Sequence, residues 1–202
     1  DAMQTFWWNE TVFYEAFVRS FKDSNGDGKG DIQGLISKLD YLNDGNPNTT
    51  TDLGITGLWL MPIMQSPSYH GYDVIDYETI EQDYGTNADF QQLITECHNR
   101  GIKVIIDLVM NHTSNQHPWF VASTNPANDK RDWYIWEESD PNTPGPFGND
   151  PWVQYGADWY YAAFANSMPD LNFNNPEVHQ AFEDVAEFWL TDMDVDGFRL
   201  DA

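Results

Sequence analysis

Two patterns of apolar residues alternate along this chain. Nearly continuous apolar runs are typical of buried strands, whereas apolar residues spaced by three, four and seven are typical of helices that bury one face. The runs predict strands at 12–18, 54–63, 103–109 and 196–201. The spaced residues predict helices at 31–44, 87–101 and 174–193.

Cap signals place the ends of these helices. Asp31 and Asn87 precede the first two, and Gly101 is expected to end the second. Asn175 followed by Pro176 marks the start of the third, because proline suits the first helical position. The order is therefore strand, helix, strand, helix, strand, insertion, helix, strand, which implies parallel strands with helical crossovers.

Two architectures share this order, a doubly wound sheet and a (β/α)8 barrel. No G-x-G-x-x-G follows any predicted strand, and polar residues follow the strands at their carboxyl ends, which favours the barrel. Residues 113–168 lose the periodicity and are rich in Pro, Gly, Asn, Asp and Trp, so they read as a loop-rich insertion. The expected organisation is a barrel part at 1–112, an inserted domain at 113–168 and a continuation of the barrel at 169–202.

Composition narrows the class of partner. With 41% hydrophobic residues in 202, the chain can bury a core, and 33 acidic against 9 basic residues give a net charge of -24. Such a charge repels nucleic acid and anionic membranes, and it is met in secreted and salt-adapted proteins. We find no apolar stretch long enough to span a membrane and no leader, and the single Cys97 reads as a buried thiol.

Polar side chains gather where neighbouring strands end. In the last strand, alternation sends Arg199 and Asp201 to the same face, and a guanidinium keeps a nearby carboxylate ionised, as a nucleophile requires. Taken alone, an Arg-x-Asp pair on a strand is more often a structural ion pair, so the assignment depends on its surroundings. Asp107, Asn111 and His112 cluster at the carboxyl end of the preceding predicted strand, where a buried strand has no structural need for three polar groups.

The stretch SYHGYDVIDY, residues 68–77, brings further groups to the same rim. Aromatic rings can cover the apolar face of a sugar, while carboxylates and imidazoles form hydrogen bonds with its hydroxyl groups. The candidate sugar-binding residues here are His70, Tyr72 and Asp73.

An acidic loop, DSNGDGKGD at 23–31, could hold a hard cation. Its side-chain oxygens alternate with small residues, so a tight turn could aim several of them at one Ca²⁺ ion. The loop resembles half of an EF-hand but has Gly34 where the bidentate Glu would stand, and the alternative is a solvated acidic turn. The side chains concerned are Asp23, Asn25, Asp27 and Asp31.

Four stretches together carry a resemblance: DLVMNH, GFRLDA, GLWLMPI and MPDLN. In this order and spacing, they are similar to stretches of the α-amylase superfamily of retaining glycoside hydrolases, over essentially the whole chain. The stretch MPDLN resembles the group between oligo-1,6-glucosidases and neopullulanases.

The resemblance implies a fold and roles for the candidate residues. It implies the N-terminal half of a (β/α)8 barrel, strands 1–4, with a B domain inserted after strand 3. Asp201 would be the nucleophile, fixed by Arg199, with His112 and Tyr72 around the reacting sugar and Asp107 a member of the same site. Lys29 would add its backbone carbonyl to the calcium site, and a second site could use Asn111 and Asp170.

The expected function is endo-hydrolysis of α-1,4 bonds in starch by a secreted, or alternatively periplasmic, α-amylase. The acid/base glutamate would lie on the fifth strand, so the remainder of the barrel, in the same or a companion chain, is the expected partner, and residues 1–202 alone should be inactive. One alternative is an α-glucosidase or oligo-1,6-glucosidase that acts on short oligosaccharides. Others are a non-catalytic escort protein and a calcium-dependent carbohydrate-binding fragment.

Overall fold

The computed structural model describes residues 5–201, so Ala202 of the predicted GFRLDA stretch lies outside the described part. The chain divides into two compact units, which we describe separately. Unit 1 consists of the described residues up to Ile63 together with Ile80–Asp107 and Trp189–Arg199. Unit 2 consists of Met64–Thr79, Leu108–Phe188 and the described residues after Arg199.

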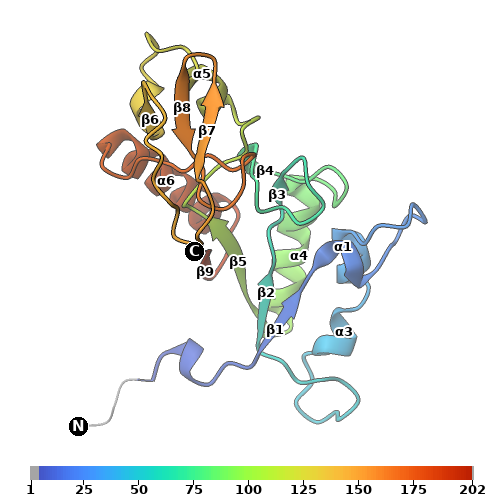
Figure 1. Ribbon diagram of the computed structural model, residues 1–202. Coiled ribbons are helices and arrows are strands. Elements are labelled where there is room, and N and C mark those ends of the chain that lie inside the picture. The colour runs from blue at the N-terminus through green and yellow to red at the C-terminus, as the bar shows by residue number, and fades with distance from the viewer. Residues whose placement is uncertain (1–4, 202) are drawn as a thin grey trace. The chain divides into compact units, whose positions relative to one another are not determined.

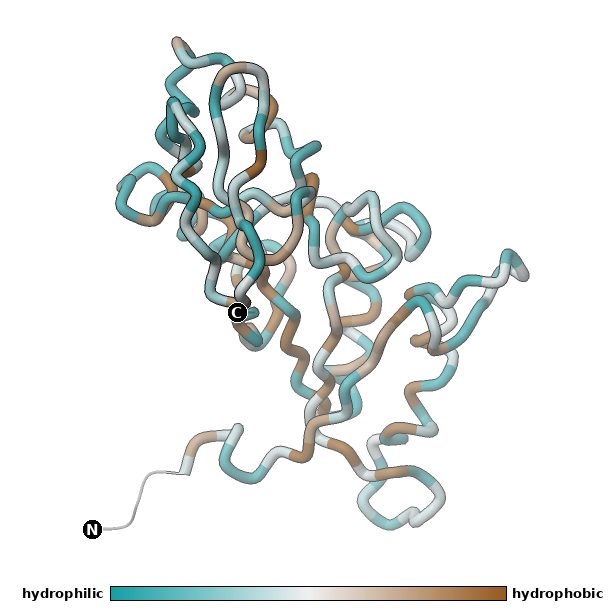
Figure 2. Tube along the Cα trace, in the orientation of Figure 1, coloured by the Kyte–Doolittle hydropathy of each residue, from teal (hydrophilic) through white to brown (hydrophobic). Residues whose placement is uncertain are grey.

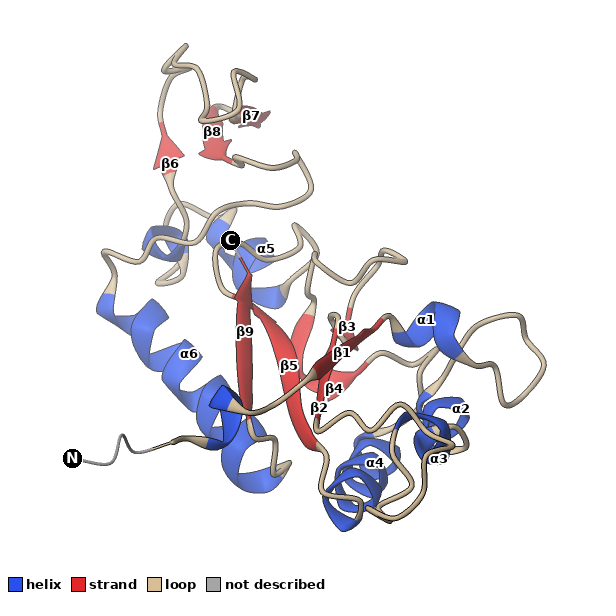
Figure 3. Cartoon of the chain, turned by 90° about the horizontal axis from the view of Figure 1, so that it is seen from below, coloured by secondary structure: helices blue, strands red, loops and turns tan. Residues whose placement is uncertain are grey.

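The main sheet has four strands, and all four predicted strands are present in it. They are β1 (Phe13–Ala16), β2 (Gly57–Leu60), β5 (Lys103–Val109) and β9 (Gly197–Asp201), in the order β1-β2-β5-β9 (Figures 1 and 3). β2 pairs in parallel with both β1 and β5. The spatial order follows the chain order with no reversal, which is the arrangement of successive barrel strands rather than of a doubly wound sheet.

Unit 1 buries the apolar residues of β2 and β5 under helices. Leu58, Leu60, Val104 and Ile106 are fully buried, in accordance with the apolar runs of their strands (Figure 2). Helix α4 (Asn87–Asn99) adds Phe90, whose ring meets the edge of Trp189 at 5.4 Å between centroids. Burying each of these rings contributes roughly 2–3 kcal/mol.

The predicted helix 31–44 is two short helices, α2 (Ile32–Ile36) and α3 (Leu39–Leu42), so this prediction was wrong in its continuity. The Ser37 hydroxyl donates to the carbonyl of Gly34 at 2.6 Å and competes with the helical ladder at the break. The apolar stripe is nevertheless buried, because the short helix on each side of the break still faces the core. The predicted cap at Asp31 is confirmed, since its carboxylate accepts from the Gly34 amide at 2.6 Å.

Helix α4 begins one residue earlier than predicted. Its cap is Thr86, not Asn87, and Thr86 forms a capping box with Asp89. Asn87 instead uses its side-chain oxygen to accept from the amide of Ile80 at 2.9 Å. The predicted end is confirmed, since Gly101 follows the helix with φ +72°, a conformation that glycine adopts without strain.

Short segments complete unit 1. The 3₁₀ turn η1 (Trp7–Asn9) precedes β1, and α1 (Val18–Phe21) follows it. Cys97 is fully buried in α4, and burial raises the pKa of its thiol to about 12, so the predicted role as a buried thiol is confirmed.

Unit 2 contains two small sheets and its own helices. β3 (Met64–Gln65) pairs with β4 (Asp76–Ile80), and a second sheet has the order β6-β8-β7 with antiparallel pairs. That sheet is formed by β6 (Trp136–Glu137), β7 (Trp152–Tyr155) and β8 (Asp158–Tyr161), within the stretch predicted to be an insertion. The remaining elements are α5 (Pro118–Ser123), η2 (Arg131–Trp133) and α6 (Pro176–Glu187). The π-helical turn η3 (Phe188–Asp192) continues from α6, and its residues after Phe188 belong to unit 1. Asn175 caps α6 and Pro176 opens it, as predicted.

Candidate active site

Unit 2 contains a cavity of about 400 Å³ in which predicted site residues meet. Its lining residues are His70, Tyr72, His112, Phe164, Ala165, Met168 and Asp201. Four of these, Asp201, His112, Tyr72 and His70, are the nucleophile and sugar-binding candidates of the sequence. The cavity therefore offers a carboxylate, two imidazoles and a phenol to one ligand.

His112 is a buried, neutral member of this cavity. It is 2% exposed, and its Nε2 lies 3.0 Å from the backbone oxygen of Tyr72, so the neutral ring carries its proton on Nε2 and donates it. Burial lowers the pKa of His112 from its ordinary value, although the charges of Asp170 and Asp201 act in the opposite direction. The ring lies 5.3 Å from that of Phe164, between centroids.

His70 is fixed by its own loop. Its Nδ1 accepts from the amide of Tyr72 at 3.1 Å, so Nε2 carries the proton and is the donor that the imidazole can offer to a ligand. The Tyr72 ring stacks near it at 6.1 Å.

Asp73 is the buried centre of that loop. It is 5% exposed, and one carboxylate oxygen accepts from the hydroxyls of Ser66, at 2.8 Å, and Ser68. It is not among the residues that line the cavity, so its position among the described residues is that of a support for the loop.

Arg199 and Asp107 form a second group, in unit 1. The guanidinium donates to Asp107 at 2.9 Å, and the indole of Trp59 donates to the other carboxylate oxygen at 3.2 Å. Asp107 is fully buried, which requires such partners, because an unpaired buried charge is costly. The Arg199 guanidinium also lies 5.3 Å from the Trp59 ring centroid.

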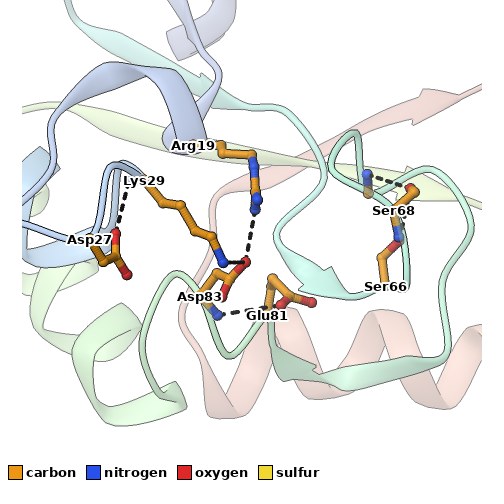
Figure 4. A network of polar contacts seen from close by, with 8 residues as sticks. Arg19, Asp27, Lys29, Ser66, Ser68, Glu81 and Asp83 are labelled. Atoms are coloured by element: carbon orange, nitrogen blue, oxygen red, sulfur yellow. Dashed lines mark hydrogen bonds and ion pairs between the residues drawn. The ribbon is translucent and has the colours of Figure 1, made fainter.

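The acidic loop 23–31 has a defined shape. Asp23 accepts from the amides of Asn25, Gly26 and Gly28, and these bonds lower the pKa of its carboxyl. Asp31 caps α2 with one oxygen and accepts from Ser24 with the other. The loop is anchored to unit 1 through Lys29, whose ammonium lies 2.6 Å from Asp83, which also pairs with Arg19 at 2.9 Å (Figure 4).

The donor set of this loop fits calcium chemically, because carboxylate and amide oxygens are the ligands that Ca²⁺ prefers. Gly34, where an EF-hand would have glutamate, cannot carry a side chain here, since an added Cβ would lie 1.9 Å from the Lys22 carbonyl oxygen. Among residues 5–201, no group of three or more His, Cys, Asp or Glu side chains converges closely enough to hold a metal ion. Asn111 and Asp170, the second pair considered, are hydrogen-bonded to each other at 3.0 Å.

A larger cavity, of about 820 Å³, lies beside β6 and β8 and is lined by residues such as Arg131, Trp136 and Glu137. It contains none of the predicted site residues. Its arginine is already paired with Asp158 and lies over the Trp136 ring, 3.9 Å from the centroid. The smaller cavity, which combines an accessible carboxylate with imidazoles, is therefore the better candidate for catalysis.

The sequence did not point to three of the cavity residues. Phe164, Ala165 and Met168 come from the irregular stretch before α6, where no periodic pattern marks a wall. The nearest signal was the short stretch MPDLN, which begins at Met168.

Comparisons with known proteins identify the family of the chain. The profile of the family described as "Alpha amylase, catalytic domain" matches residues 15–202. The chain is 50% identical to alpha-amylase 3 of Dictyoglomus thermophilum over 97% of its own length, and 43% identical to an oligo-1,6-glucosidase of Parageobacillus thermoglucosidasius over 99%. A crystal structure of an alpha-amylase from H. orenii superposes on 95% of the chain with a TM-score of 0.89 and 52% identity.

The chain therefore belongs to the α-amylase family of glycoside hydrolases. It spans 37% and 36% of the two relatives' lengths and 40% of the solved chain. Together with the parallel sheet, this likeness confirms the predicted fold class, the N-terminal part of a (β/α)8 barrel.

Proposed function

We propose that the whole protein is an α-amylase that hydrolyses internal α-1,4-glucosidic bonds of starch and related glucans with retention of configuration. The observation that carries this proposal is the position of Asp201 in one cavity with His112, Tyr72 and His70. Relatives named as alpha-amylases support it, while relatives named as oligo-1,6-glucosidases and alpha-glucosidases keep hydrolysis of short oligosaccharides as the second candidate.

In the proposed reaction, the Asp201 carboxylate attacks the anomeric carbon and forms a covalent glycosyl-enzyme intermediate. The neutral His112 ring and the phenol of Tyr72 lie in the same cavity, where they would hold the hydroxyls and the face of the reacting sugar. Arg199, on the same strand as Asp201, would fix the nucleophile, with Asp107 holding the guanidinium. Asp73 would act through the loop that carries His70.

A retaining hydrolase needs a second carboxyl group about 5–5.5 Å from the first, to protonate the leaving oxygen and then activate water. Asp201 is the one carboxylate in the cavity lining of the described residues, and the chain spans 37% of the first relative. We propose that the acid/base glutamate belongs to the remainder of the barrel and that residues 1–202 alone are inactive.

Further proposals concern calcium and location. The loop formed by Asp23, Asn25, Asp27, Asp31 and the Lys29 carbonyl would bind one Ca²⁺ ion as a structural cation. A secreted protein is proposed because its charge of -24 suits a soluble surface that avoids nucleic acid and anionic lipid. Within residues 5–201, every helix is too short or too polar to cross a membrane.

The function is tested with the full-length enzyme on soluble starch and on isomalto-oligosaccharides. An α-amylase removes iodine staining before much glucose appears, and nuclear magnetic resonance detects the α-anomer as the first product. Rapid glucose release from isomalto-oligosaccharides with slow loss of iodine staining would show the second candidate instead. No hydrolysis of either substrate would support a non-catalytic protein.

The nucleophile is tested by Asp201→Asn, which should lower kcat by about four orders of magnitude or more. Asp194→Asn is the matched control, because the Asp194 side chain is 79% exposed and does not line the cavity, and the residue has φ +58°, which asparagine tolerates. The control should retain activity. Equal activities of the two variants would contradict the assignment of Asp201.

A further inference from the structure

One buried hydroxyl in unit 2 joins two backbone carbonyls near the proposed active site. Tyr77 lies in β4 and is 3% exposed. Its hydroxyl lies 2.8 Å from the carbonyl oxygen of Val109 and 3.1 Å from that of His112. Burial raises the pKa of this hydroxyl well above its ordinary value, so it remains a donor at neutral pH.

The two carbonyls mark the ends of the turn that carries His112. Val109 is the last residue of β5, and the chain bends at Asn111 before it reaches His112. Both Val109 and His112 are almost fully buried, so water cannot replace the tyrosine as their partner. The shared hydroxyl therefore fixes the distance between the strand end and the backbone of His112.

The side-chain end of His112 is held separately. The His112 Nε2 donates to the Tyr72 carbonyl. The carbonyl of the adjacent Asn111 accepts from the Leu171 amide at 2.9 Å. Tyr77 thus controls the backbone from which the imidazole projects, while Tyr72 controls the orientation of the ring. A shift of the backbone would move the imidazole even with the second contact intact.

The Tyr77 ring is fixed independently of its hydroxyl. It meets the edge of Phe182 at 5.1 Å and packs against His117 at 5.6 Å and Trp119 at 5.8 Å, between ring centroids. Tyr77 is not among the residues that line the cavity. It therefore does not contact a ligand in the cavity directly, and loss of the hydroxyl leaves the ring packing in place.

We propose that Tyr77 is a positioning residue of the active site, which sets the place of the His112 imidazole by sharing its one hydroxyl proton between the carbonyls at both ends of its turn. This inference rests on the proposed glycosidase function, in which His112 contacts the reacting sugar.

The test uses the full-length enzyme and the substitution Tyr77→Phe. We expect kcat to fall about ten- to hundredfold with KM changed less than about threefold, because a small misplacement of a positioning group costs rate chiefly in the transition state. Tyr84→Phe is the matched control, since Tyr84 is also 3% exposed but belongs to unit 1. It should leave kcat within about twofold of the wild type, by the same comparison of rates.

A double-mutant cycle separates positioning from general damage. In the His112→Ala background, Tyr77→Phe should have no further effect on kcat, because its influence passes through the imidazole. Multiplicative effects of the two substitutions in folded proteins, or an unchanged kcat in Tyr77→Phe, would overturn the inference. If the wild-type enzyme hydrolyses no α-glucan, the proposed function fails first, and the crystal structure of Tyr77→Phe still tests whether the turn 109–112 moves.

A rescue variant covers the case in which Tyr77→Phe does not fold. 4-Aminophenylalanine at position 77 places two N–H donors where the hydroxyl stood, one for each carbonyl. It should fold and keep kcat within about threefold of the wild type, as expected if donation is the required property. A folded amino variant with the low rate expected for phenylalanine would contradict the proposal.

Discussion

The buried carboxylate of Asp107 receives the Arg199 guanidinium at 2.9 Å, across a separation of 92 residues in the sequence. Asp107 lies in β5 and Arg199 in β9, which are neighbours in the sheet. The pair therefore joins two neighbouring strands of the main sheet. Burial makes the Asp107 charge costly to desolvate and therefore dependent on its partner, because the Asp107 side chain has no exposed surface while the Arg199 side chain is 36% exposed.

Replacing the buried partner should destabilise the protein. Asp107→Asn removes the charge that offsets Arg199 and changes an acceptor of Trp59, so we expect the free energy of unfolding to fall by about 1–3 kcal/mol. The measurement is urea denaturation of the full-length protein. Asp40→Asn is the control, because Asp40 also pairs with an arginine, Arg100, but its side chain is 73% exposed. A loss above about 0.5 kcal/mol in the control would show that burial is not the cause.

The stability at acid pH should depend on His117. Burial lowers the pKa of His117 to about 4, against a value of about 6.5 for an unfolded histidine. Between these values the unfolded chain binds one proton more than the folded chain, so the stability falls as the pH decreases from about 6.5 to 4. His112 contributes in the same direction, because burial lowers its pKa as well.

His117→Asn should remove this loss without removing the cap of α5. The His117 Nδ1 accepts from the Trp119 amide at 3.0 Å, and asparagine can accept in the same way. Between pH 7 and pH 5, we expect the variant to lose about 2 kcal/mol less stability than the wild type. Urea midpoints at the two pH values measure the difference, and the same exchange at exposed His179 should not change it.

Local signals in the sequence predicted much of the fold. The apolar run of 103–109 became β5, and the Asn175-Pro176 signal marks the start of α6, because both depend on residues next to one another. The same reasoning failed within 31–44, where the apolar stripe is continuous but the helix is interrupted next to the Ser37 hydroxyl. It also assigned the cap of α4 to Asn87 rather than Thr86. In the structure the Thr86 side chain accepts from the Asp89 amide of the helix, whereas the Asn87 side chain accepts from the Ile80 amide.

The candidate site was predictable where it follows a strand and not elsewhere. His112 comes shortly after β5 and Asp201 ends β9, so strand ends indicated both. Phe164 and Met168 line the cavity from irregular backbone, which no periodic pattern predicts. The hydrogen bond of the Tyr77 hydroxyl depends on tertiary packing, which residue spacing does not predict either. The burial of Asp73 beneath the loop could not be read from HGYDV, because a polar residue in a loop is usually exposed.

The contribution of the Thr86 cap to stability can be tested by replacing Thr86 and, for comparison, Thr95 within α4. Thr86→Ala removes the hydroxyl that accepts from the Asp89 amide at 3.2 Å, and we expect a loss of about 1 kcal/mol. Thr95→Ala removes a hydroxyl that donates back to the Gln91 carbonyl within the helix, where alanine is the better helix former, so its effect should stay within about 0.5 kcal/mol. Thermal denaturation of both variants compares them, and equal losses would contradict the capping role.

Calcium should stabilise the protein through the loop 23–31. A cation that binds only the folded chain raises its stability by about 2.7 kcal/mol at a concentration one hundred times its Kd, so a chelator should lower the thermal midpoint of the full-length protein. Asp27→Ala removes a proposed ligand whose side chain accepts from the Lys29 amide at 2.8 Å. This variant should lose the response to added calcium, whereas Asp129→Ala, at another exposed aspartate, should keep it. An equal rise of the midpoint in both variants would place the responsible cation elsewhere, because the loop would then be dispensable for binding.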